Sequence, residues 1–176
     1  PDYALILIDG ASTVGVVQDE RLCYNVRLND SFIKTGGEDK PTLVRSKKTG
    51  TLCFSTDEVG DNVVTEIDVR IVPGFGANII PECFYLKKGC QVNKDGPRME
   101  VIAPGGKRTL LKAEALKHDN SWLFHTKIKV HHGPPKSIGR TNATTAIDMV
   151  DCVQTTYNLP LTEAEEEKRS LSETIR

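Results

Sequence analysis

The sequence predicts a mainly β protein, with a β-barrel or β-sandwich over about residues 3–130 and a short helical tail after it. Short apolar runs follow one another along this stretch, and several alternate apolar and polar residues with a period of two, as half-buried strands do. Gly, Pro, Asn and Asp separate the runs, at spacings typical of a barrel or a sandwich. After Ile128 the apolar positions change to a helical spacing, which divides the chain into 1–130 and 131–176.

Eight strands are expected, in the order of the apolar runs. They are Tyr3–Ile8, Ser12–Val17, Pro41–Arg45, Thr51–Ser55, Val63–Val72, Met99–Ala103, Thr109–Ala113 and Trp122–Ile128. Turns are expected at Asn29-Asp30, Gly36-Gly37, Lys48-Thr49-Gly50, Pro73-Gly74, Asp95-Gly96-Pro97 and Pro104-Gly105-Gly106. In the fifth run the residues that share one face are Thr65, Ile67, Val69 and Ile71. Residues 78–88 allow a helical turn, which Pro81 limits to its first turn or excludes.

The tail begins with a linker, His-His-Gly-Pro-Pro, at residues 131–135. Apolar residues at helical spacing follow, and they are Ile147, Val150, Val153 and Tyr157. Pro160 ends this segment, and a capping box at Thr162–Glu165 opens a second, mostly charged helix. Residues 137–176 share no apolar pattern with the β region, so we expect them to be dispensable for the β fold.

Composition indicates an ordinary globular chain, with 38% hydrophobic and 27% charged residues. The net charge of −1 gives no strong field for nucleic acid or an anionic membrane, so direct binding to either is not expected. The apolar stretch Ala4–Ile8 is too short to cross a bilayer or to form a signal-peptide core. Five scattered cysteines favour reduced thiols in an intracellular, cytoplasmic setting. The start at Pro1 rather than Met is expected of a processed product or a piece of a longer chain.

The most informative segment is Leu5–Thr13, in which an apolar strand ends in Asp9 and is followed by Gly10, Ala11 and two hydroxyl residues. Aspartic proteases need a carboxylate at a strand end, on a tight turn, facing a second carboxylate with which it shares one proton. One carboxylate then acts as base on a water and the other as acid towards the scissile carbonyl. A chain with one such Asp would take the second from a twofold-related copy, which predicts a homodimer if the enzyme is active.

The same segment also fits a plainer structure. An Asp-Gly pair flanked by apolar strands is the strongest short-range signal for a type I′ β-hairpin. On local sequence alone, we favour the hairpin over a catalytic turn at Asp9-Gly10.

Several segments together resemble the region between the zinc knuckle and the integrase in the Pol polyproteins of Copia-type LTR retrotransposons. That family shows an apolar run ending in Asp-Ser-Gly-Ala-Ser or Asp-Ser-Gly-Ala-Thr, then a Val-Pro-Gly-x-x-x-Asn-Leu-like segment, which is similar to Val72–Ile80 here. A piece ending in Lys-Gly resembles Leu86–Val92, and a closing strand resembles Asn120–Phe124. The matches keep the family's order over roughly residues 4–130.

The resemblance implies a retropepsin-like closed β-barrel over 1–130, an aspartic endopeptidase activity on peptide or polyprotein substrates, and a degenerate pre-integrase segment over 131–176. It implies no cofactor or metal. Its catalytic residue would be Asp9, and its substrate-binding residues would be Gly10, Ala11 and Ser12.

The chain departs from the family motif at the site itself. If Gly10-Ala11-Ser12 is aligned on the family's Gly-Ala-Ser, Ile8 takes the catalytic position and Asp9 replaces the small hydroxyl residue. A shift of one residue along a strand turns a side chain to the other face, and a catalytic dyad tolerates little misplacement. The sequence therefore predicts a catalytically impaired domain.

Other chemistry finds little support in the sequence. Leu43–Phe54 suits a hairpin, either the flap of such an enzyme or an ordinary strand connection. His131, His132 and Cys152 lack the partners and spacing of a zinc site, so no metal is expected. Two functions of different classes stay open: an aspartic endopeptidase that cuts its own polyprotein as a homodimer, or a decayed or repurposed fragment that serves as a non-catalytic interaction module.

Overall fold

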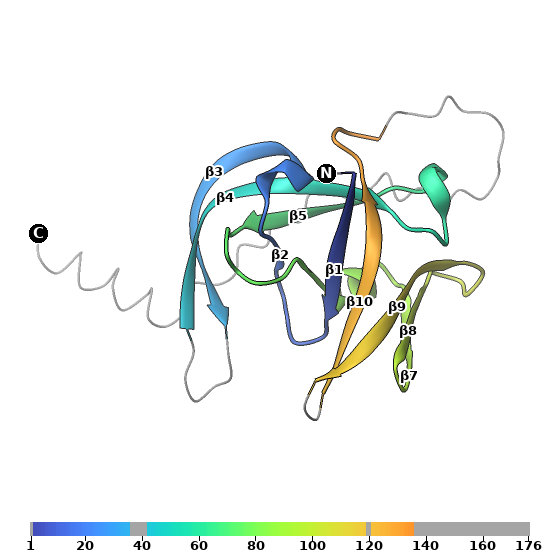
Figure 1. The fold of residues 1–176 in the computed structure, drawn as a ribbon. Coiled ribbons are helices and arrows are strands. Elements are labelled where there is room, and N and C mark those ends of the chain that lie inside the picture. The colour runs from blue at the N-terminus through green and yellow to red at the C-terminus, as the bar shows by residue number, and fades with distance from the viewer. Residues whose placement is uncertain (1, 36–41, 119–120, 136–176) are drawn as a thin grey trace, which may run out of the picture.

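A computed structural model of the chain describes residues 2–35, 42–118 and 121–135. The described part is mainly β, as predicted (Figure 1). Its strands are β1 (Tyr3–Asp9), β2 (Gly15–Val17), β3 (Cys23–Thr35), β4 (Thr42–Ser55), β5 (Thr65–Ile71), β6 (Ile79–Pro81), β7 (Gln91–Asp95), β8 (Arg98–Ile102), β9 (Thr109–His118) and β10 (Ser121–Val130). Its helices are α1 (Glu82–Lys87) and the 3-10 turns η1 (Glu20–Leu22) and η2 (Gly60–Asn62).

The strands form one sheet in which six strands close into a hydrogen-bonded ring. The sheet order is β3-β4-β5-β2-β6-β1-β10-β9-β8-β7, and an additional β4–β10 pairing joins Phe54 to Val130 and completes the ring. Outside the ring, β3 pairs with β4 alone, while β9, β8 and β7 extend from β10 (Figure 1). Most pairings are antiparallel, but β1 runs parallel to β6 and β2 runs parallel to β5.

The main core is one apolar cluster that the ring shares with α1, β8 and β9, and it depends on alternation along the strands. In β1, Ile6 and Ile8 are buried, and β4 and β10 contribute Leu52, Phe54 and Ile128 to the same cluster. Strand β5 shows the predicted alternation, with three buried apolar residues between half-buried charged ones. Burial of this apolar surface is the main term that favours folding.

The segment 42–55 corrects two predictions. It is one continuous strand, β4, so the expected turn at Lys48-Thr49-Gly50 and the expected hairpin over Leu43–Phe54 are both wrong. Around Lys48 and Thr49 this backbone pairs with β3 on one side and β5 on the other, which outweighs the local turn preference. Gly50 is needed for close approach instead, because a Cβ there would lie 2.8 Å from the Cβ of Cys23.

Strands β3, β6 and β7 were not predicted. The expected turn at Asn29-Asp30 lies inside β3, where the register with β4 shifts between Leu28 and Ser31, so a bulge takes the place of a turn. The predicted second strand is shorter and begins at Gly15. The turns at residues 95–97 and 104–106 are confirmed between β7 and β8 and between β8 and β9.

Helix α1 begins one residue after Pro81, which is its N-cap with an extended backbone. Pro81 therefore precedes the helix and does not interrupt it, because proline is tolerated where the helix has no hydrogen bond to lose. At the other end of the described chain, β10 ends at Val130. The predicted turn at Gly36-Gly37 and the predicted helices after Thr144 lie outside the described residues.

Candidate functional site

Asp9 is the last residue of β1 and the start of a tight turn. It is half-buried, and its neighbour in parallel β6 is Pro81. Its Oδ1 accepts a hydrogen bond of 2.9 Å from the backbone N–H of Ala11, which makes an Asx turn. The carboxylate is thus held at a strand end, as predicted.

The prediction of a type I′ hairpin at Asp9-Gly10 is wrong. Strand β1 does not pair with the strand that follows it, since its two neighbours in the sheet are β6 and β10. The chain leaves β1, crosses five residues from Gly10 to Val14, and enters β2 on the far side of β6. The non-local pairing with β6 decides the conformation of this segment, and the Asp-Gly signal, which is local, does not.

Alternation along β1 separates Asp9 from the residue before it. Ile8 is 4% exposed and packs in the core, whereas Asp9 lies on the opposite face. A carboxylate at position 8 would enter the apolar core, so position 9 is the place at this strand end where a carboxylate remains in contact with water.

The predicted substrate-binding residues follow in the same loop. Gly10 and Ala11 are exposed, and Ser12 is half-buried. The Ser12 hydroxyl donates to the carbonyl of Val14 at 2.8 Å, and the Ser12 carbonyl lies 3.7 Å from the thiol of Cys83. Ser12 therefore stabilises its own loop, while Gly10 and Ala11 present backbone to solvent.

An ion pair that the sequence did not indicate lies against this turn. Glu82, the first residue after β6, accepts from Lys94 of β7 at 2.5 Å, and the Glu82 side chain is only 15% exposed. A Cβ on Gly10 would lie 3.0 Å from Glu82 Oε2 and 3.6 Å from Lys94 Nζ. The two charged side chains thus cover one side of the turn that carries Asp9. The one available signal was that Glu82 follows an apolar run, as Asp9 does.

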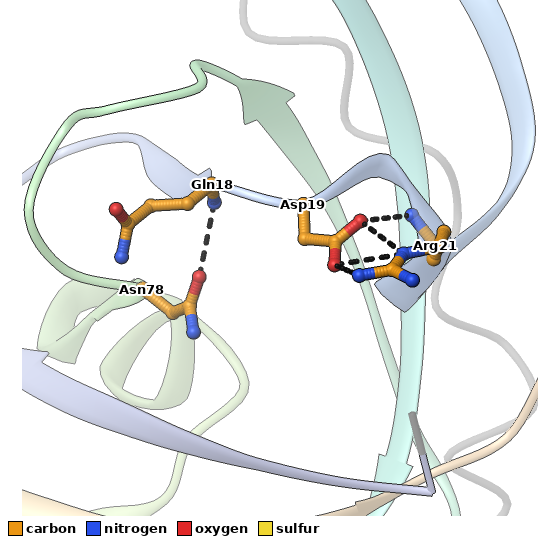
Figure 2. Close-up of polar contacts among 4 residues, drawn as sticks. All are labelled: Gln18, Asp19, Arg21 and Asn78. Atoms are coloured by element: carbon orange, nitrogen blue, oxygen red, sulfur yellow. Dashed lines mark hydrogen bonds and ion pairs between the residues drawn. The ribbon is translucent and has the colours of Figure 1, made fainter.

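Asn78 fixes the position of β1 relative to β2. Its Oδ1 accepts from the backbone N–H of Gln18 at 3.0 Å, which Figure 2 shows, and its Nδ2 donates to the carbonyl of Leu5 at 3.0 Å. Its own carbonyl accepts from the N–H of Leu7 at 2.8 Å. The asparagine of the Val-Pro-Gly segment therefore has a structural role, since it holds the strand that ends in Asp9.

Beside this bridge, Asp19 and Arg21 form a local ion pair at 2.7 Å (Figure 2). The hydrogen bonds from the Arg21 side chain and backbone lower the pKa of Asp19 from 3.8 to about 2. Asp19 also caps the turn η1 by accepting from the N–H of Arg21. This carboxylate is engaged within one turn and stabilises it.

Two other constellations with possible chemistry are closed to substrate. Ser55 Oγ lies 2.9 Å from His131 Nε2 and 3.3 Å from Asp61 Oδ1, but Ser55 is only 2% exposed. Burial raises the pKa values of the Cys23 and Cys53 thiols to about 12, so neither is a ready nucleophile at neutral pH. Among the described residues, no group of three His, Cys, Asp or Glu side chains could hold a metal ion.

Neither the scan against protein-family models nor the search of curated proteins gives a match to this chain. Within the described ranges, no helix has the length and apolar character needed to cross a membrane.

Proposed function

We propose that this chain is an aspartic-protease-like domain of a Copia-type retrotransposon polyprotein that is catalytically impaired in its present form. The observation that carries the proposal is the placement of Asp9 at the end of β1, on a tight turn and half-exposed. A carboxylate in such a position can meet the carboxylate of a second copy, as an aspartic dyad requires.

The fold supports the first half of the proposal. Under this proposal, the hydrogen-bonded ring of strands is a closed barrel of the retropepsin type, and the parallel β1–β6 pair presents Asp9 at one end. The β3–β4 pair is the candidate for the flap, because β4 begins six residues before Lys48, the first of its residues to pair with β5, where the partner is Ile71. Ser31–Thr35 of β3 pairs with this free part of β4, forming a two-stranded arm.

The turn after Asp9 supports the second half of the proposal, the catalytic impairment. The family motif has a small hydroxyl residue between Asp and Gly, whereas here Gly10 follows Asp9 directly. The Glu82–Lys94 ion pair lies against Gly10, so a longer turn would have to displace it. The missing residue shifts the Asp9 carboxylate by one position relative to the family motif. A misplacement of a reacting carboxylate by about 1 Å is enough to abolish most catalysis.

The second candidate function, a non-catalytic interaction module inside the cell, is favoured by a different observation. Large apolar side chains are exposed on β1, β3, β9 and β10, and such groups on a folded domain mark contacts with other protein segments. In both functions the expected partners are protein, either a polyprotein substrate or a second copy, and nucleic acid is not among them.

A peptide-cleavage assay on the full chain tests the proposal, run from mildly acidic to neutral pH with sedimentation to record dimers. We expect no cleavage by the wild-type chain and partial recovery when a Ser is inserted between Asp9 and Gly10. Asp57→Asn, at an exposed turn after β4, is the matched control for Asp9→Asn. Wild-type cleavage that only Asp9→Asn abolishes would overturn the impairment, and cleavage that survives Asp9→Asn would overturn the site itself.

A further inference from the structure

The outward face of β1 and its neighbours carries a row of apolar side chains, here named the outer stripe. It consists of Tyr3, Leu5 and Leu7 of β1, Leu123 of β10 and Leu116 of β9. Leu5 is 58% exposed and Leu116 is 68% exposed, although both lie in regular strands. Leu116 and Leu123 are direct cross-strand partners, and Leu123 lies two residues from His125, the partner of Leu7, so the stripe passes diagonally from β1 to β10 and β9.

One cation, Lys127, borders the stripe next to β1. Lys127 of β10 is the cross-strand partner of Leu5, and its ammonium lies 4.3 Å from the centre of the Tyr3 ring. Lys129 is the partner of Tyr3, but its ammonium is already paired with Asp61 at 2.6 Å. A segment that covers the stripe should therefore combine apolar residues with acidic ones.

We propose that residues 144–157 of the same chain dock on the outer stripe as an amphipathic helix. This segment has apolar residues at Ile147, Val150 and Val153, which fall on one helical face, with acidic residues Asp148 and Asp151 beside them. The acidic residues match Lys127, the cation that borders the stripe. This inference does not depend on catalysis, and it gives the tail a role that the proposed function leaves open.

The geometry of the chain permits this docking. Strand β10 ends at Val130, next to Lys129, so the chain leaves the sheet at the end of the stripe where Tyr3 lies. The residues from 131 to 143 can span up to about 40 Å when extended. A helix from Ile147 to Tyr157 is about 16 Å long, close to the roughly 13 Å that separates Tyr3 from Leu7 along the strand.

Paramagnetic broadening in the full chain tests the proposal. A nitroxide on Cys152, in a Cys23→Ser, Cys83→Ser background, would place the probe inside the segment. We expect the methyl signals of Leu5 and Leu123 to lose most of their intensity, while those of Leu28 on β3, which is 84% exposed, stay sharp. The introduction of Val150→Asp should restore the Leu5 and Leu123 signals without changing the thermal melt.

Each other outcome overturns the proposal. Equal broadening at Leu5 and Leu28, or none at either, would mean that the segment does not choose the stripe. Broadening that appears only when isotope-labelled and spin-labelled chains are mixed would show that a second copy covers it. Leu5→Asp should release the segment, whereas the matched Leu28→Asp should not, and a reversed result would also refute the docking. Since none of these readouts needs peptide cleavage, their failure is distinguishable from failure of the proposed function.

Discussion

Replacing Asn78 with Ala should lower the free energy of unfolding by about 2 kcal/mol, because two side-chain hydrogen bonds are lost at once. The bond from the Gln18 N–H is part-buried, and its loss leaves a backbone donor without its partner. The bond to the Leu5 carbonyl is exposed, so water replaces it in part and its share is smaller. For a domain of this size, the change corresponds to a fall in melting temperature of about 6 °C.

Chemical denaturation of the full chain, followed by circular dichroism, measures this loss. Asn78→Asp separates the two bonds, because a carboxylate still accepts from Gln18 but cannot donate to Leu5. We expect Asn78→Asp to cost about 1 kcal/mol, between wild type and Asn78→Ala. Asn93→Ala, at an exposed asparagine of β7, is the matched control and should be near neutral. A loss in Asn78→Ala no larger than that in Asn93→Ala would refute the bridging role.

Two further predictions follow from close contacts. Gly50→Ala should destabilise the chain by about 2 kcal/mol, because its Cβ would meet the Cβ of Cys23 and neither atom can move without the backbone. Gly133→Ala is the control, because a Cβ at Gly133 would lie in open space. Equal denaturation midpoints for the two variants would contradict the steric argument. Arg21→Ala should return the pKa of Asp19 from about 2 towards 3.8 in an NMR titration. Because the pKa of Asp19 is lower in the folded chain, the stability that this pair contributes is present above pH 3.8 and is lost as the pH falls towards 2. An unchanged pKa of Asp19 in Arg21→Ala would assign the shift to another cause.

Sequence patterns predicted well where one strand face is apolar and the other polar. Strand β5 and the core of β1 follow period two closely, and the turn at residues 95–97 contains the Gly that its geometry requires, with a φ of 54° at Gly96. Strand β3 was not predicted because it is an edge strand with two register shifts and a single buried residue, so its apolar residues do not alternate regularly.

The mainly β fold and the place of Asp9 at the end of an apolar strand could be predicted from the sequence, since both depend on the order of neighbouring residues. That Thr42–Ser55 is a single strand and that β1 runs beside β6 depends on pairing between segments far apart in the chain. The physical reason is that backbone hydrogen bonds between distant segments outweigh a local Asp-Gly or Lys-Thr-Gly turn preference. The same long-range pairing brings Glu82 and Lys94 against Gly10, two side chains that lie more than seventy positions away in the sequence.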